Sequence, residues 1–492
     1  MNNVLVLPLL IPLVTAVLLL FFTRYIVVQR WLSTLGVFLN IAAGGFMMTQ
    51  VRSEGIQVLY MGGWVPPYGI VFVADMLGAL LVFTTSIVSA FCLFYAFGTI
   101  GREREKYYFY PLFQFLLVGI NGSFLTGDIF NLFVCFEVML ISSYALIVLG
   151  GTKRQLQETL KYMLINIISS SLFVAAVAYL YGVVGTLNMA DLSLKVAEAG
   201  QSGVLNVIAL LFMIVFSLKA GLFLFFWLPG SYSAPPAAVS ALFAALLTKV
   251  GIYALLRTFT LLFHSDPDMT HNWLMWLAIA TMVLGALGTV AYHDIRQIMN
   301  YNVVVSVGLI IFGLAVSSKE ALDGAVFYLL HDMVAKALLF ILGGLIIQAA
   351  GTSDIRQTGG LIRSYPLMGA LLFVTALAIA GIPPFSGFAG KLLLIQGGLR
   401  EGYYGLIAVA LGSSLIVLYS LLRIFMHAFW GEAKAIIDQR STVTPKQILS
   451  AVGLSVLVIG MGLGSEAVYE FASEAGHTLI HPMEYVEAVL KE

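Results

Sequence analysis

Three lysines lie in the middle of stretches that are otherwise apolar and long enough to cross a membrane. These are Lys219, Lys249 and Lys336. An ionised side chain near the centre of a bilayer costs about 2.5–3.5 kcal/mol on insertion scales, so it persists where it is paired, hydrated or used. Glu137 occupies a fourth apolar stretch. One buried charge is compatible with packing alone, but several together predict a route for protons or cations.

The residue types also indicate how such a route would work. Burial favours the neutral form of a lysine and a nearby carboxylate favours its charged form, so a Glu137–Lys219 pair predicts a protonation switch. Histidine titrates near neutral pH when it is unperturbed, which suits His331 to a relay. Asp332 and Lys336 are four residues apart, a spacing that allows an ion pair on one helix face. A purely structural salt bridge, or a histidine that only bonds a backbone carbonyl, remains open as an alternative.

The composition assigns the chain to a class. It is 60% hydrophobic and 10% charged, whereas about 25% of the residues are charged in ordinary soluble proteins. The sequence therefore predicts an all-α polytopic membrane protein in a lipid bilayer. The formal net charge of zero gives no reason to expect nucleic acid as a partner. Cys92 and Cys135 lie in apolar stretches without metal-ligand spacing, so we expect packing roles for them, no metal site and no cofactor.

Hydropathy over windows of about 19 residues predicts about 14 transmembrane helices. The first begins almost at the N-terminus without a basic leader, so we interpret it as a spanning helix and not as a signal peptide. The predicted spans are 3–22, 31–50, 71–98, 107–125, 129–149, 158–183, 204–228, 236–262, 273–292, 298–316, 322–349, 367–397, 403–429 and 446–464.

Basic residues outside the spans predict the orientation. Fourteen Lys and Arg residues fall in the loops that follow odd-numbered spans, against five in the other loops and the tails. By the positive-inside rule, the odd-numbered loops face the cytoplasm. We therefore expect a multi-pass protein of the plasma membrane with both termini on the extracytoplasmic side.

A weak internal repeat indicates a duplication. Three short matches share an offset of 166 residues, among them Asp128-Ile129 with Asp294-Ile295 and Gly185-Thr186 with Gly351-Thr352. Five predicted spans separate equivalent points, and an odd number inverts the second copy in the membrane, as in many secondary transporters. We expect an N-terminal four-helix segment, a five-helix repeat with proton half-channels, a second, inverted five-helix repeat and a C-terminal surface segment, at 1–127, 128–293, 294–464 and 465–492.

One helix in each repeat, the seventh and the twelfth of the chain, is predicted to be discontinuous. The seventh span runs into Pro229, and the twelfth contains Pro383 and Pro384. Proline interrupts the helical hydrogen-bond ladder, which is tolerated at membrane depth where the freed backbone lines protein or water. Lys219 and Lys391 lie close to these breaks. A loop turn between two complete helices is the alternative for the first break.

Several segments resemble one known family. FNLFVCFEVMLISSYALIVLGG, SLKAGLFLFFWLPGSYSAPP, HDMVAKALLF and GIPPFSGFAGK are similar to segments of the antiporter-like subunits shared by respiratory complex I and the Mrp-type multisubunit Na+/H+ antiporters. The resemblance covers nearly the whole chain. The length of the chain, the FEVMLISSY segment and Lys391 resemble the Mrp branch. One complex I branch usually has glutamate at the position that matches Lys391.

The resemblance implies a function and a set of site residues. It implies a proton-translocating subunit of a Na+/H+ antiporter, not an enzyme, that assembles with other subunits into a hetero-oligomeric membrane complex. It assigns the switch to Glu137 and Lys219, the connecting site to Lys249 and the terminal site to Lys391. The ions would be H+ and Na+. Because the sequence shows no oxygen-rich cluster of the kind that hard cations prefer, we expect sodium to pass partly or wholly through other subunits.

Two other functions remain open at this point. The first is a proton-pumping subunit of complex I or of a related membrane-bound redox complex, and the second is a scaffold with an inactive channel.

Arg257 and Arg423 lie towards span ends, where we expect them to snorkel or to anchor the structure. We expect Asp75 to lie at the membrane interface. The serines at 169–171 are compatible both with a hydrated path and with helix packing.

Overall fold

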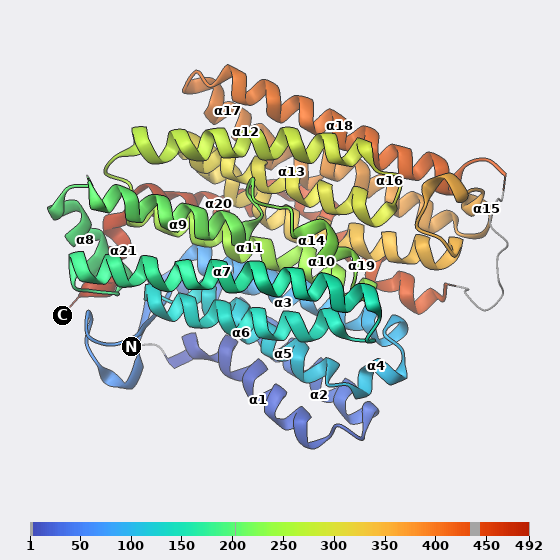
Figure 1. Ribbon diagram of the computed structural model, residues 1–492, viewed down its shortest axis with the longest axis horizontal. Helices are drawn as coiled ribbons and strands as arrows, with labels where there is room; N and C mark the ends of the chain where they lie inside the picture. The colour runs from blue at the N-terminus through green and yellow to red at the C-terminus, as the bar shows by residue number, and fades with distance from the viewer. Residues whose placement is uncertain (1–2, 202, 433–442, 492) are drawn as a thin grey trace.

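The computed structural model describes residues 3–201, 203–432 and 443–491. It is a bundle of helices that run along the long axis of the molecule (Figure 1). Eleven helices among the described residues are long and apolar enough to cross a bilayer. They are α1 (Leu7–Phe21, with the turn before it), α2 (Ile26–Glu54), α3 (Met76–Thr99), α6 (Ile129–Val148), α7 (Lys153–Val184), α11 (Ala237–Leu261), α12 (Pro267–Ala291), α13 (Ile295–Val316), α14 (Lys319–Ala350), α18 (Tyr404–Phe429) and α19 (Pro445–Leu463).

The remaining elements are shorter. Three apolar helices of intermediate length are α5 (Phe109–Leu125), α9 (Val204–Ala220) and α16 (Pro366–Ala380). The other helices are α4 (Arg102–Lys106), α8 (Met189–Ala199), α10 (Leu228–Ser233), α15 (Leu361–Ser364), α17 (Ser386–Arg400), α20 (Ser465–Ile480) and α21 (Pro482–Leu490). Single 3₁₀ turns are Asn3–Val6, Met61–Gly63 and Ile355–Gln357, and one hairpin joins β1 (Gln57–Tyr60) to β2 (Val71–Ala74). The predicted all-α membrane fold is confirmed.

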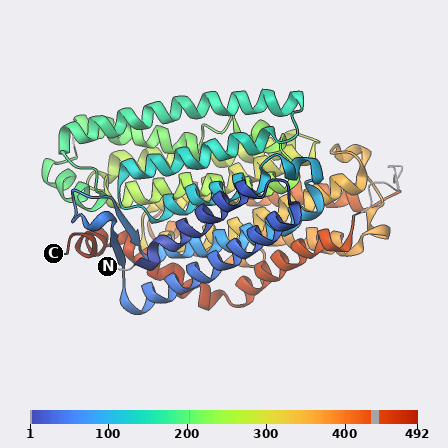
Figure 2. The same cartoon turned by 90° about the horizontal axis from the view of Figure 1, so that it is seen from below.

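The centre of the bundle holds α11, α13 and α14, while the first helices lie at its edge. Within the apolar stretch of each helix, all of the α11 residues and 94% of the α13 residues are buried, whereas 33% of the α1 residues are buried. Seen from below, α1 and α2 (dark blue) lie on the near side of the bundle (Figure 2). Large apolar side chains such as Val14 and Trp31 are exposed there. Lipid tails would cover such a surface in the membrane.

The sequence repeat corresponds to a repeat of structure. Helices α7 and α14 both have 32 residues, and their first residues, Lys153 and Lys319, are 166 positions apart. Each helix ends before a glycine in the left-handed conformation, Gly185 after α7 and Gly351 after α14. Glycine adopts this conformation without the steric penalty that a Cβ atom would bring. The two longest helices among the described residues are therefore equivalent elements of the two repeats.

Two isolated β-bridges show that the second repeat is inverted. Asp128 pairs with Asn188, and Asp294 pairs with Asp354, again at an offset of 166 residues. Asp128 and Asp294 also cap the helices that follow them, α6 and α13, by accepting backbone N–H groups with their side chains. The first bridge lies beside α8 and the second beside α15, at opposite ends of the bundle (Figure 1). The prediction of inverted repeats is confirmed.

Both predicted breaks exist, but the first begins earlier than expected. Helix α9 ends at Ala220, and Gly221, which has a left-handed φ of 75°, closes the helix as its C-cap. Pro229 lies further on, at the second position of the short α10, where a missing N–H is tolerated. Pro229 is therefore not the residue that breaks the seventh span. Pro383 and Pro384 do lie in the break between α16 and α17, as predicted.

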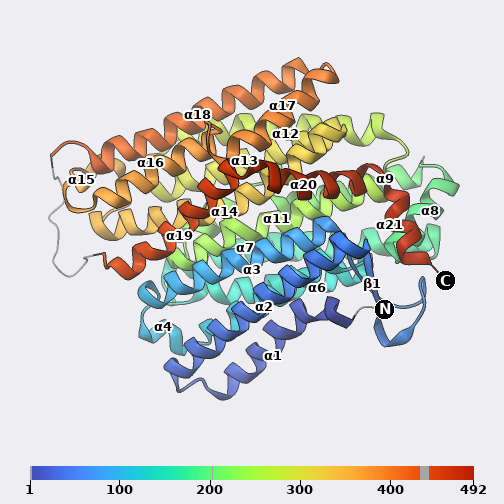
Figure 3. The ribbon, with the colours of Figure 1, turned by 180° about the vertical axis from the view of Figure 1, so that it is seen from behind.

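The C-terminal helices fold back onto the bundle. Helix α19 leads into α20 and then α21 across the face shown in Figure 3. Helix α20 packs against α14 and α3, and α21 packs against α8. Ala472, Ala475 and Gly476 are buried on α20, so small residues permit the close approach. Both chain termini lie at the same end of the bundle (Figure 1).

Candidate functional site

Asp332 lies at the centre of the candidate pathway, between two lysines. Its Oδ2 atom is 2.7 Å from Nζ of Lys249 on α11, and its Oδ1 atom is 3.5 Å from Nζ of Lys336 on α14. All three side chains are at most 1% exposed. Lys249 also donates a hydrogen bond of 2.7 Å to the carbonyl of Ala244. One carboxylate cannot neutralise two protonated lysines, so this buried cluster favours the release of one proton.

Lys391 lies on α17, and its side chain reaches back to the break between α16 and α17. Its Nζ atom donates to the carbonyls of Ile379 and Ala380 at 2.9 Å each and to Oγ of Ser414 on α18 at 2.8 Å. The last carbonyls of a helix have no partners within it and form the negative end of its dipole. The predicted break therefore supplies the acceptors that hold this lysine at membrane depth.

His331 lies between the central cluster and Lys391. Its Nδ1 atom is 2.7 Å from Oγ of Ser386, the first residue of α17. The ring of Tyr328 is 5.3 Å from the histidine ring, and Nζ of Lys391 is 5.7 Å from the centre of the same tyrosine ring. A side chain at Gly390 would press on the backbone of Tyr328, so glycine brings α17 close to α14. His331 and Lys391 thus share one neighbour.

Glu137 and Lys219 are connected, but not directly. Nζ of Lys219 on α9 donates a hydrogen bond of 3.0 Å to Oγ of Ser170 on α7, and Ser170 donates in turn to Oε1 of Glu137 on α6. Lys219 is 5% exposed. Its ammonium group also lies 5.7 Å from the centre of the Phe136 ring. The expected pair is therefore a three-residue chain, in which a hydroxyl group can both accept and donate a proton.

Close helix packing brings α9 and α11 together at the level of Lys219. A side chain at Gly251 on α11 would collide with the backbone of Lys219 and Ala220. Lys249 is two residues before this crossing point and Lys219 lies at it. Because glycine lets two backbones approach, α9 and α11 bring their lysines to a similar depth in the bundle.

Arg257 and Asp75 form a buried ion pair, which bears on two expectations. Nη2 of Arg257 is 2.5 Å from Oδ2 of Asp75, and the two side chains are 3% and 1% exposed. The guanidinium lies 5.3 Å from the ring of Tyr253 and 4.9 Å from that of Tyr485 on α21. Of the two roles expected for Arg257, the structure therefore shows the anchor and not the snorkelling side chain, and Asp75 is not an exposed interfacial residue. Asp75 also caps α3 by accepting the N–H of Gly78.

The structure places several residues in the site that the sequence did not single out as such. Ser170, Ser386 and Ser414 each contact one of the predicted titratable groups, and Asp332 pairs with Lys249 as well as with Lys336. The Asp332–Lys336 spacing was a visible signal. A serine inside an apolar helix carries none, because it equally suits helix packing. Arg423 donates to backbone carbonyls of Val290 and Tyr292, which fits the expected structural anchor.

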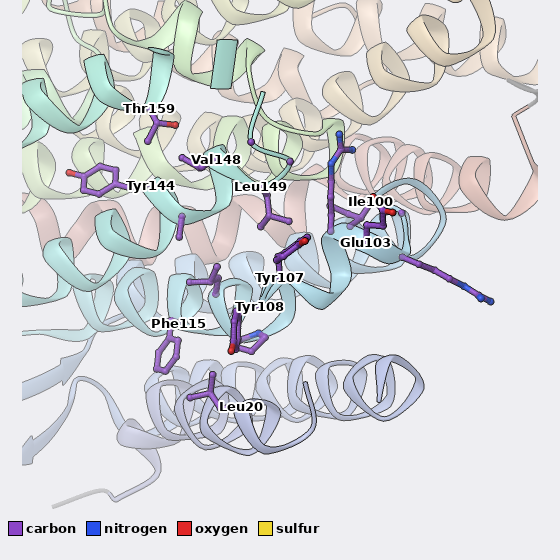
Figure 4. A pocket seen from close by; sticks show the side chains of 18 of the residues that line it. Leu20, Ile100, Glu103, Tyr107, Tyr108, Phe115, Tyr144, Val148, Leu149 and Thr159 are labelled. Carbon is purple, nitrogen blue, oxygen red and sulfur yellow. The ribbon is translucent and has the colours of Figure 1, made fainter. Parts of the chain in front are cut away.

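Other features of the structure carry no pathway residue. No group of three or more His, Cys, Asp or Glu side chains among the described residues is arranged to hold a metal ion. Cys92 and Cys135 are buried and unpaired, in accordance with packing roles. A cavity of about 1270 Å³ lies between α1, α5, α6 and α7 and is lined by residues such as Leu20, Tyr108 and Tyr144 (Figure 4). None of the predicted pathway residues lines it.

Comparison with known proteins places these features in a family. Residues 126–417 match the family described as "NADH:quinone oxidoreductase/Mrp antiporter, TM". The chain is 49% identical to the D subunit of the Na(+)/H(+) antiporter of Bacillus subtilis (strain 168), over the full length of both proteins. It superposes with a TM-score of 0.92 on a chain of the Mrp complex from Dietzia sp. DQ12-45-1b, at 29% identity and full coverage of both chains.

A second solved structure belongs to a redox enzyme. The chain superposes with a TM-score of 0.91 on a chain of the membrane-bound sulfane sulfur reductase, an archaeal respiratory complex, at 27% identity and with 99% of this chain and 100% of that chain covered. The fold defines an antiporter-like membrane subunit. The chain belongs to the NADH:quinone oxidoreductase/Mrp antiporter family, and the full-length relative is a D subunit of a Na+/H+ antiporter.

Proposed function

We propose that the chain is the proton-translocating subunit of a multisubunit Na+/H+ antiporter of the plasma membrane. The observation that carries the proposal is the shared carboxylate of Asp332 between Lys249 and Lys336, all buried in the centre of the bundle. A structural pair would need one acid for each lysine. An unbalanced cluster instead changes its protonation when a charge arrives or leaves nearby.

In this proposal, protons travel along a row of groups that crosses the bundle. The row starts at Glu137, Ser170 and Lys219, continues through the Lys249–Asp332–Lys336 cluster and ends at His331 and Lys391. Each break in a helix holds a lysine, since Lys219 lies in the last turn of α9 and Lys391 lies on the last carbonyls of α16. A proton that leaves one lysine exposes its carboxylate partner, which favours protonation of the next lysine in the row.

Sodium is proposed to pass partly or wholly through other subunits. The positive charges of protonated lysines at the centre of the path repel a sodium ion. Hard cations also require several oxygen ligands around one point, and no acidic or histidine cluster among the described residues meets that need. The coupling of sodium to protons would then depend on the whole complex, with both chain termini on the extracytoplasmic side by the positive-inside rule.

The alternative is a proton-pumping subunit of a membrane-bound redox complex, which the structural likeness to the sulfane sulfur reductase supports. The identity of 49% to an antiporter D subunit, against 27% to the reductase chain, favours the antiporter. Purification of the native complex separates the two, because a redox complex would carry subunits with iron–sulfur or flavin centres and an antiporter would not.

The direct test of the proposal is Lys219→Ala in the assembled complex. Alanine is easy to bury but cannot carry a proton, so assembly should be normal and sodium-dependent proton exchange in membrane vesicles should be absent. Lys161→Ala is the matched control, because Lys161 is an exposed lysine that pairs with Glu158 on the surface of α7. Full exchange by the Lys219→Ala complex would refute the proposed role.

A further inference from the structure

A polar cavity opens at the end of the bundle that carries both termini. It has a volume of about 700 Å³ and lies between the end of α2, the starts of α3 and α14, and the C-terminal helices α20 and α21. We call it the vestibule. The acidic and basic side chains that line it are Arg52, Lys319, Glu470, Glu474, His477 and Glu484. None of these residues belongs to the proposed proton row.

Asp323 lies behind the wall of the vestibule and is completely buried. Its Oδ2 atom accepts a hydrogen bond of 3.4 Å from the hydroxyl of Tyr469, which lines the cavity. Its Oδ1 atom has no partner in hydrogen-bond geometry among the described residues, and Ser473 of α20 also interacts with the carboxylate. A buried carboxylate with an unpaired oxygen is costly when it is ionised. Such a group is relieved either by taking up a proton or by contact with water from the adjacent cavity.

Helix α20 is shaped to hold this carboxylate. A side chain at Gly476 would collide with Oδ1 of Asp323, so glycine leaves the space that the carboxylate occupies. The groups that face Asp323 are Tyr469, Ser473 and His477 from α20 and Lys319 from its own helix. Tyr469, Ser473 and His477 are spaced so that they lie on one face of α20. This face turns towards α14 and also lines the vestibule.

Asp323 also lies on the helix that carries the centre of the proton row. His331 is eight residues further along α14, which corresponds to about 12 Å along the helix axis. The C-terminal helices α19 and α20 also connect the level of His331 with the level of Asp323. A side chain at Gly462, near the end of α19, would collide with the backbone of Pro384 and Ser386, and Ser386 is the partner of His331. Helix α20 starts just after this contact and runs to the vestibule.

The charges of the vestibule suit a cation. Asp323 and the three glutamates outnumber the fixed positive charges of Arg52 and Lys319, and one of these, Arg52, already pairs with Glu470 at 2.8 Å. A concave surface with an excess of one charge raises the local concentration of the opposite ion. Burial raises the pKa of Glu474 above its ordinary value, although the charge of Arg52 opposes the shift. The cavity therefore presents protonatable carboxyl groups and not only fixed charges.

We propose that the vestibule is the port at which protons from the outer solution reach this subunit, and that Asp323 is the acid that exchanges them with the proton row. A hydronium ion in the vestibule gives its proton to the carboxylate of Asp323. An O–H bond forms there and water is released, and the bond breaks again when the proton passes inward towards His331. The inference rests on the proposed function, because it supplies the outer end of that row.

The first test is Asp323→Asn, which keeps the size of the side chain but cannot transfer a proton. Sodium-dependent proton exchange by the assembled complex should fall by about a hundredfold, as is usual when a positioned proton-transfer group is lost. Glu320→Gln is the matched control, because Glu320 lies one turn away on α14 and pairs with Arg400 at the surface, away from the vestibule. Its exchange should remain normal.

A second test reports on access to the vestibule independently of any titration. Ser473→Cys is introduced after Cys92 and Cys135 have been replaced by alanine, and a cationic, membrane-impermeant methanethiosulfonate reagent is added from the outer side. The reagent should react and block exchange. The exposed Ser265→Cys, in the loop between α11 and α12, should react without loss of exchange.

Parallel assay of Lys336→Ala separates the two proposals. Loss of exchange in Lys336→Ala together with full exchange in an assembled Asp323→Asn complex would overturn the port and leave the proton row in place. Loss in Asp323→Asn with full exchange in Lys336→Ala would refute the row and support the vestibule as the start of another path. Reaction at Ser473→Cys without any effect on exchange would also overturn the port.

Discussion

Replacement of Asp332 by asparagine perturbs the proposed pathway at its most charged point. The change keeps the shape of the side chain and removes the negative charge that Lys249 and Lys336 share at 2.7 and 3.5 Å. With an effective dielectric constant of 20, the lost Coulomb attraction is about 6 kcal/mol for Lys249 and about 5 kcal/mol for Lys336. Much of this attraction offsets the cost of burying the charges, so the net effect is smaller.

Measured losses for breaking buried ion pairs set the expected size. Removal of one partner typically costs about 3–5 kcal/mol, because a charge is left buried without compensation. The complex can avoid this cost if one lysine gives up its proton. Whether the lysines stay charged or one of them gives up its proton, the negative charge of Asp332 is lost, and the proposed row needs that charge. Since each 1.4 kcal/mol corresponds to a factor of ten, we expect exchange to fall by about a hundredfold or more.

The assay is sodium-dependent proton exchange in inside-out membrane vesicles, read with a pH-sensitive dye. Assembly of the complex is measured separately on native gels, so that a loss of exchange is not confused with a loss of protein. Asp332→Glu keeps the charge and should retain partial exchange. An assembled Asp332→Asn complex with wild-type exchange would refute the reasoning, since the two lysines would then function without their carboxylate.

Three further predictions concern other parts of the chain. Ser170→Ala should lower exchange about tenfold or more, because hydrogen bonds to charged groups contribute about 1.5–3 kcal/mol. Ser170→Thr keeps the hydroxyl and should remain active. Equal exchange by both variants would contradict a role for Ser170 as the bridge between Glu137 and Lys219. Arg257→Ala should leave Asp75 buried and unpaired, which lowers the free energy of unfolding by about 3–5 kcal/mol and reduces the melting temperature of the complex. The protein that assembles should keep substantial exchange. An unchanged melting temperature would argue against a stabilising Arg257–Asp75 pair. The purified single chain in liposomes should show no sodium-dependent proton flux, and robust exchange by the chain alone would remove the need for partner subunits.

The fold was predictable from the sequence to the level of helices and their symmetry. Apolar stretches of membrane length are visible in any hydropathy window, and lysines within them stand out because charge is rare there. The offset of 166 residues, carried by motifs such as Asp128-Ile129, corresponds to helix caps in the structure. Caps require specific residue types, which explains why they preserve a signal after most of the repeat has diverged.

The partners of the charged groups were less predictable. Asp75 and Arg257 are 182 positions apart, and neither has a local feature that indicates the other. Ser170 is one of three consecutive serines, and only the helix rotation decides which of them faces Glu137 and Lys219.

The C-terminal segment shows the same limitation at the level of an element. Its acidic residues and Pro482 suggested a surface segment, and Glu470 and Glu474 do border a cavity. The small residues Ala472, Ala475 and Gly476 on the other side of α20 allow it to pack against α14 and Asp323. A short helix with alternating small and acidic residues does not reveal its partner from sequence alone, because the apolar face is too weak to specify one helix.

The measurement that tests the central claim most directly is made on a complex in which Glu137 and Lys219 are both replaced by apolar residues of similar size, as Glu137→Leu with Lys219→Met. No unpaired charge then remains buried at this site, so a pair that serves only the structure would be dispensable. Assembly and sodium-dependent proton exchange are measured separately on the same preparation. We predict normal assembly and no exchange, because the first proton-carrying groups are missing. Exchange at the wild-type rate would contradict the account of this chain as a proton path.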